Sequence, residues 1–71
     1  MIFAICLDNE GCEASLELRK IYPVARPERN DPKGYIRIVD ESGEDYLYNA
    51  TAFEVIELPP QTRRKLEATL R

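Results

Sequence analysis

The chain of 71 residues has no histidine, no tryptophan and only two cysteines, Cys6 and Cys12. A structural zinc site usually needs four Cys or His ligands, so one copy of this chain cannot supply it. Ser15 and Ser42 lack the histidine base that a hydrolytic nucleophile normally uses, and the three glycines are too far apart for a phosphate-binding loop. We therefore predict a protein that is not an enzyme and that has no metal or cofactor.

A long hydrophobic run is also missing. The apolar start, residues 1–7, is too short to span a membrane and has no basic residue before it, unlike a signal peptide. Two cysteines cannot form the multi-bridge framework of a small secreted domain. We therefore expect a cytoplasmic protein with reduced thiols and no membrane association.

Charge is unevenly distributed along a chain whose net charge is −3. Residues 1–58 carry six Lys or Arg against twelve Asp or Glu, whereas residues 59–71 carry four against one. An acidic protein is a poor general binder of nucleic acid, because phosphate contacts depend on positive charge. Nucleic acid is therefore an unexpected partner, and the basic tail has an acidic body nearby to attract it.

The stretch 34–58 has the clearest structural pattern. Residues 35–39 and 45–48 are rich in aromatic and β-branched side chains, and the turn between them contains Gly43. Residues 49–52 are typical of a single 3₁₀ turn, and residues 53–58 alternate again as a strand. Together with strands at 1–7 and 20–25, this predicts a mostly β protein with five strands.

The flanking segments carry further expectations. In the first strand we expect the bulkier set, Phe3, Ile5 and Leu7, to enter the core, and Pro23 predicts that its strand lies at a sheet edge or carries a bulge. Residues 61–71 form a predicted helix that is too short to be stable alone. A first strand that is apolar on both faces is compatible with a monomer whose helix covers it, or with a weak homodimer.

The order of these elements resembles the SH3-like β-barrel. Residues 47–56, LYNATAFEVI, are similar to the end of a typical SH3 domain, L-F-P-A-N-Y-V-E-L-I, and residues 16–24 are similar to its entry strand. The chain is also similar to a family of small bacterial proteins that share the core G-Y-I-R-I-x-D-E-S-G-E-D-Y-L-Y, a resemblance that implies no activity. What is implied is one domain, residues 1–71: a small five-stranded SH3-like barrel with a helical tail over 58–71.

The proline-binding groove of SH3 domains is not reproduced. Its proline and one of its tyrosines fall at Asn49 and Ala52, and tryptophan is absent. Two aromatic walls that would hold a polyproline helix are therefore missing. The resemblance predicts a fold and does not predict recognition of proline-rich ligands.

Two candidate surfaces remain. Tyrosine is frequent at interfaces, and an exposed face made by tyrosines on the strands, together with the loop 26–33, predicts a protein-interaction module with an unknown protein partner. Its residues are Tyr22, Tyr35, Tyr46 and Tyr48. The alternative is a regulatory or accessory nucleic-acid-binding protein, which would use Arg37, Arg63, Arg64 and Lys65. The acidic run at 40–45 matches no calcium loop and is interpreted as a solvated hairpin tip.

Overall fold

The computed structural model describes residues 1–70. Five strands form one antiparallel sheet in the order β4-β3-β2-β1-β5. The 3₁₀ turn η1 (Ala50–Ala52) precedes the last strand, and α1 (Pro60–Ala68) follows it. The strands are β1 (Ile2–Cys6), β2 (Ile21–Val24), β3 (Tyr35–Val39), β4 (Asp45–Asn49) and β5 (Phe53–Ile56). The predicted mostly β fold is confirmed, with its 3₁₀ turn and its short C-terminal helix.

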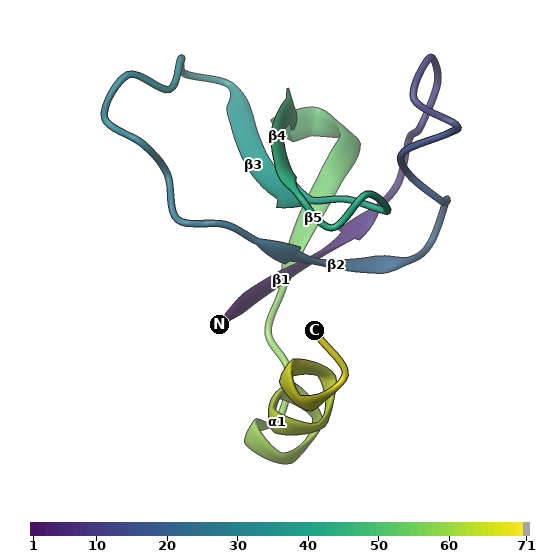
Figure 1. The fold of residues 1–71 in the computed structure, drawn as a ribbon, viewed down its shortest axis with the longest axis vertical. Coiled ribbons are helices and arrows are strands. Elements are labelled where there is room, and N and C mark those ends of the chain that lie inside the picture. Colours follow the sequence, from purple (N-terminus) through teal and green to yellow (C-terminus); the bar gives the residue numbers. More distant parts are fainter. Residues whose placement is uncertain (71) are drawn as a thin grey trace.

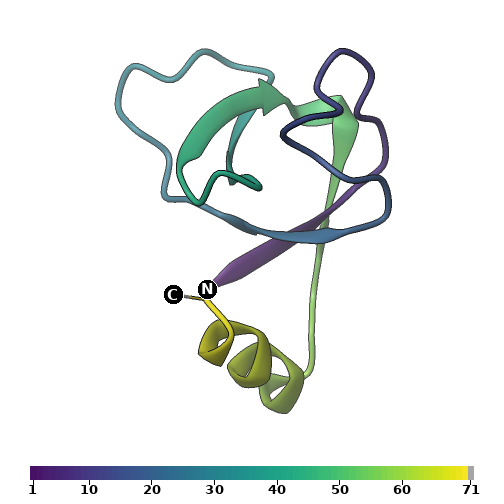
Figure 2. The same cartoon turned by 45° about the vertical axis from the view of Figure 1, so that its right-hand side comes forward.

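The sheet is strongly curved, as Figures 1 and 2 show. β4 and β5 lie at opposite ends of the strand order, yet the rings of Tyr48 on β4 and Phe53 on β5 have their centroids 6.0 Å apart. Phe53 also meets Tyr22 of β2 edge-on, with the centroids 6.5 Å apart. Side chains from every strand therefore converge on one inner face, where they form the core.

The inner face of β1 differs from the prediction. Ala4 and Cys6 belong to the central core cluster, whereas Leu7 is exposed and Phe3 is buried on the other face, beside α1. The register gives the reason, because Ala4 lies opposite Tyr22, and Cys6 lies opposite Phe53. Two large rings fill the limited space inside a curved sheet, and small residues on β1 leave room for them.

Pro23 does not mark an edge, because β2 lies between β1 and β3. β2 pairs with β3 at one position, Val24 opposite Ile38. The missing N–H of Pro23 therefore removes no hydrogen bond from a longer β2–β3 ladder. The backbone is irregular just before β2. The Cys6 amide donates to the Lys20 carbonyl, the Arg19 amide donates to the Cys6 carbonyl, and Arg19 has a φ of 66°. A residue with a side chain at this φ occupies the left-handed region that favours glycine.

The hairpin between β3 and β4 has the turn that its sequence predicts. The Gly43 amide donates to the Asp40 carbonyl, and the Asp40 amide donates to the Glu44 carbonyl. Gly43 has a φ of 84°, which suits the glycine position of a three-residue hairpin loop. This turn places two carboxylates, those of Asp40 and Glu41, beside the tyrosines of the core.

Helix α1 lies near the beginning of the chain, below the strands in Figure 1. Its apolar residues Leu66 and Leu70 lie near Phe3, and its Glu67 forms an ion pair with the Met1 ammonium at 3.2 Å. No residue of α1 is buried. The central core cluster contains no residue of α1, and the helix lies beside Phe3 on the opposite face of β1.

Candidate protein-interaction surface

The inner face of the sheet is sealed at one end only. Leu16, from the loop that follows β1, is fully buried in the core cluster and closes the end of the core near Cys6. At the opposite end, Ile2 and Val55 are 58% and 53% exposed. The register places both of them on the same face as the buried Ala4. The row of inward-facing side chains therefore continues from the core into the open.

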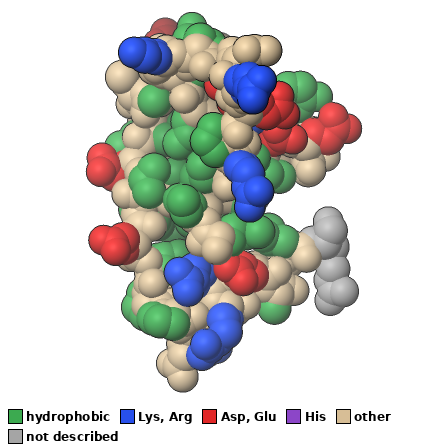
Figure 3. Space-filling view, turned by 90° about the vertical axis from the view of Figure 1, so that its left-hand side faces the viewer, with side chains coloured by type: hydrophobic (Ala, Val, Ile, Leu, Met, Phe, Trp, Pro, Cys, Tyr) green, Lys and Arg blue, Asp and Glu red, His purple; other side chains and the backbone are tan. Residues whose placement is uncertain are grey.

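An apolar groove of about 850 Å³ occupies this open end. It lies between β5 and the start of β3, and the loop that begins at Arg26 borders it. Figure 3 shows hydrophobic side chains gathered in the middle of this face, between the sheet above and the helix below. The side chains that make the groove apolar are Met1, Ile2, Val24, Pro27, Tyr35, Ile36 and Val55.

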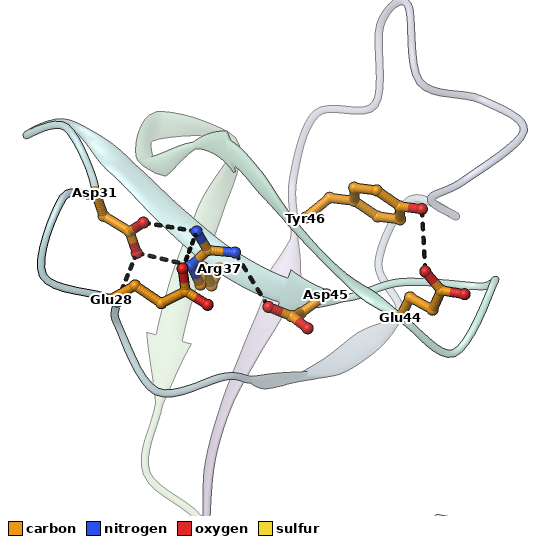
Figure 4. A network of polar contacts seen from close by, with 6 residues as sticks. All are labelled: Glu28, Asp31, Arg37, Glu44, Asp45 and Tyr46. Atoms are coloured by element: carbon orange, nitrogen blue, oxygen red, sulfur yellow. Dashed lines mark hydrogen bonds and ion pairs between the residues drawn. The ribbon is translucent and has the colours of Figure 1, made fainter.

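The charged groups beside the groove are largely neutralised. Arg37 donates two hydrogen bonds to Asp31, at 2.8 and 2.7 Å, and one each to Glu28 and Asp45, both at 3.1 Å (Figure 4). These carboxylates, Asp31 first, raise the pKa of Arg37, and the bond from Arg37 lowers the pKa of Asp31. The loop 26–33 is thereby attached to β3, and it frames the groove.

Of the predicted tyrosine face, Tyr35 and Tyr46 are exposed, at 51% and 50%, and only Tyr35 lines the groove. Tyr22 is 3% exposed and Tyr48 packs against the core, so the prediction that all four share an exposed face is wrong. The register does not by itself separate the exposed tyrosines from the others, because Tyr46 and Tyr48 share one face of the hairpin and only Tyr48 packs against the core. Tyr35 alternates onto the other face.

Tyr48 and Tyr22 each donate a hydrogen bond to a carboxylate of the β3–β4 turn, the buried Asp40 and the exposed Glu41 respectively. The Tyr48 hydroxyl donates to Asp40 at 2.5 Å, and burial followed by this bond raises the pKa of Tyr48 to about 12. The Tyr22 hydroxyl donates to Glu41 at 2.5 Å and accepts the Glu17 amide at 2.7 Å. Tyr22 and Tyr48 therefore stabilise the fold. The sequence feature that could have indicated this role is a pair of carboxylates, Asp40 and Glu41, in the turn between β3 and β4.

The acidic residues of this turn act as partners within the fold. Burial alone would raise the pKa of Asp40, but hydrogen bonds from Ser42 and Tyr48 bring its pKa below the ordinary value. Bonds from Lys20 and Tyr22 lower the pKa of Glu41. Across residues 1–70, no group of three or more His, Cys, Asp or Glu side chains is placed to hold a metal ion.

The residues of the nucleic-acid alternative are not brought together. Arg37 is on β3 and its charge is balanced by three carboxylates, whereas Arg63, Arg64 and Lys65 are exposed on α1, at the far end of the molecule in Figure 1. Within the described part of the chain, these three helix residues form no ion pair. The sequence predicted that the acidic residues of 1–58 would attract this basic segment. These three side chains are instead left without an acidic partner in residues 1–70.

Cys6 and Cys12 are both free thiols. Burial raises the pKa of the Cys6 thiol, which makes it a poor nucleophile. No helix within residues 1–70 has the length and hydrophobicity needed to cross a membrane.

Comparisons of the chain with protein-family models, curated proteins and solved structures gave no significant match. The resemblance to SH3-like barrels therefore stays a prediction about the fold family, alongside the five-stranded sheet described above. Any function has to be argued from the groove and its surroundings.

Proposed function

We propose that the protein is a non-catalytic protein-interaction module that binds an extended apolar segment of a partner protein in the groove. The observation that supports this most directly is the uncovered row of inward-facing side chains, chiefly Ile2 and Val55. Single exposed apolar residues are common on folded proteins, and Leu7 and Leu18 are examples here, but Ile2 and Val55 lie together in one groove. Contiguous apolar surface with a polar rim is typical of binding sites for other proteins.

The charge distribution supports the same proposal. Arg37, Asp31 and Glu67 border the groove, and each is already in an ion pair. A ligand that covers these groups gains little from their charges, so apolar contact is the main source of affinity. Tyr35 adds an aromatic side chain with a polar tip at the rim, the residue type most often enriched at such contacts.

The test uses a displayed library of random 12-residue peptides, selected on the purified protein. The affinity of the selected peptides is then measured for two variants, Tyr35→Thr and Tyr46→Thr. Both tyrosines are half exposed, but only Tyr35 lines the groove. We expect Tyr35→Thr to weaken binding by about tenfold or more, as hot-spot residues do, and Tyr46→Thr to change it less than twofold.

Three outcomes would overturn the proposal: failure to select any peptide, equal effects of the two variants, or loss of binding on Arg64→Ala instead. The last result, combined with a steep loss of affinity as salt is added, would favour the nucleic-acid alternative, because phosphate contacts release counterions. A groove of the kind described here predicts binding that changes little with salt.

A further inference from the structure

The groove is bordered by a strand with a free edge. β5 pairs only with β1, so its other side faces away from the sheet. The Leu7 amide donates to the Ala52 carbonyl, and in an antiparallel pair such bonded positions recur at every second residue. The next bonded positions on β5 are Glu54 and Ile56. The backbone N–H and C=O of Val55 therefore point outward along the free edge.

Val55 combines this free backbone with a side chain that lines the groove. An extended segment laid beside β5 would bond to the Val55 backbone, and every second side chain of that segment would point into the groove. The other free edge, on β4, offers no such arrangement, because no residue of β4 lines the groove. Within residues 1–70, β5 is the sheet edge that combines free backbone groups with the apolar groove.

We infer that the partner segment is added to β5 as a sixth strand, with alternate apolar side chains in the groove and a carboxylate facing Arg26. This inference rests on the proposed function and specifies its ligand. In the described part of the chain, Arg26 is the charged group in the groove that is free to pair with a ligand carboxylate. Of the charged side chains that line the groove, it is the one that has no ion pair within residues 1–70.

The length of the segment follows from β5 itself. The strand has four residues, Phe53–Ile56, and Pro59 and Pro60 come shortly after it. Short edge strands and nearby prolines are features that limit uncontrolled pairing with other chains. The edge therefore accepts a short segment of about four residues, with two side chains in the groove.

Replacing Val55 tests the backbone bond. Val55→Pro removes an N–H that points away from β1, and proline is tolerated in edge strands at such positions. Val55→Ile keeps both the N–H and an apolar side chain. With the peptides selected as above, we expect Val55→Pro to weaken binding by at least tenfold and Val55→Ile by less than threefold. A ¹H–¹⁵N spectrum establishes that the proline variant is folded.

A second measurement uses the wild-type protein and does not depend on that variant. Exchange of the Val55 amide hydrogen with solvent should slow by at least tenfold when the selected peptide saturates the protein. Peptides selected on wild type should carry Asp or Glu more often than those selected on Arg26→Gln. An unchanged Val55 exchange rate, or the same acidic content in both selections, would overturn the corresponding part of the inference.

The failures of the two proposals are distinguishable. Peptide binding that is lost on Tyr35→Thr but retained on Val55→Pro would leave the groove as the binding site and reject strand addition. Binding that survives both substitutions would reject the groove as well. Protection of the Val55 amide that grows with protein concentration alone would assign β5 to a second copy of this chain, and would overturn a separate partner as the occupant.

Discussion

The hydrogen bond between Tyr48 and Asp40 makes the sharpest prediction about stability. Asp40 is only 6% exposed, and its two carboxylate oxygens have different partners. One accepts both the amide and the hydroxyl of Ser42, at 2.9 and 2.6 Å, and the other accepts the Tyr48 hydroxyl at 2.5 Å. Tyr48→Phe removes the second partner and preserves the ring that packs on Phe53.

The expected cost follows from the charge on the acceptor. A hydrogen bond to an ionised group contributes about 1.5–3 kcal/mol to stability. When the donor is removed, water does not replace it, because the acceptor is buried. We therefore expect Tyr48→Phe to lower the free energy of unfolding by about 1.5–3 kcal/mol. In a domain of this size, that corresponds to a fall in Tm of roughly 6–24 °C.

The assay is urea and thermal unfolding at pH 7, followed by circular dichroism. Tyr46→Phe is the matched control, because the Tyr46 hydroxyl donates to Glu44 at 3.3 Å in an exposed position (Figure 4), and its removal is expected to leave stability nearly unchanged. Introducing Tyr48→Phe into Asp40→Asn should cost less than in wild type, since the acceptor then carries no charge. Equal stability of Tyr48→Phe and Tyr46→Phe would refute the reasoning.

Two further predictions concern backbone strain and pH. Arg19 has a φ of 66°, so Arg19→Gly should raise the free energy of unfolding by about 1 kcal/mol. Arg19→Ala keeps the backbone strain and should give no such gain. A gain with both variants would assign the effect to the loss of the arginine side chain. The folded-state pKa values of Asp40 and Glu41 are lowered, so their stabilising contribution is present above the unfolded pKa and is lost as pH falls through the folded values. The pKa of Tyr48 is raised to about 12, so its contribution is present below pH 10 and is lost between about pH 10 and 12. Urea midpoints measured across this range should decline at both ends, and a flat acid limb would contradict the assigned partners.

The positions of the secondary-structure elements could be predicted closely, because they depend on local patterns. The expected 3₁₀ turn at 49–52 occurs at Ala50–Ala52, and the expected helix at 61–71 occurs at Pro60–Ala68. The turn at Gly43 was predictable for the same reason, since glycine at a positive φ has no steric penalty. None of these features needs information from a distant part of the chain.

Which face of a strand points inward could not be predicted from local patterns. Alternation divides the side chains of β1 into two sets, one on each face of the strand. It does not indicate which set lies on the inner face of the curved sheet. The space near Ala4 and Cys6 is filled by rings from β2 and β5, so the set with smaller side chains is the inner one. The burial of Tyr22 could not be predicted for a related reason, because its hydrogen-bond partner Glu41 is distant in sequence and lies in a turn whose acidic residues are typical of a solvated hairpin tip.

The groove was missed because its residues look like core residues in the sequence. Val55 and Phe53 occupy equivalent positions in one alternating pattern, yet Phe53 is buried and Val55 is half exposed. The difference arises from the ends of the curved sheet. Near the β3–β4 turn, the carboxylates of Asp40 and Glu41 reach the tyrosine hydroxyls, and Leu16 closes the core.

No comparable closing contacts exist around Val55 within residues 1–70, and α1 lies beside the strands without burying any of its own residues. The tyrosine–carboxylate hydrogen bonds and the open apolar surface are therefore at different ends of the same sheet, although Val24 and Ile36 both pack on the core and line the groove. The partner strand proposed above would be added at the free edge of β5, where the Val55 backbone has no hydrogen-bond partner in β1. This separation is what allows a domain with so small a core to expose an apolar groove and remain folded.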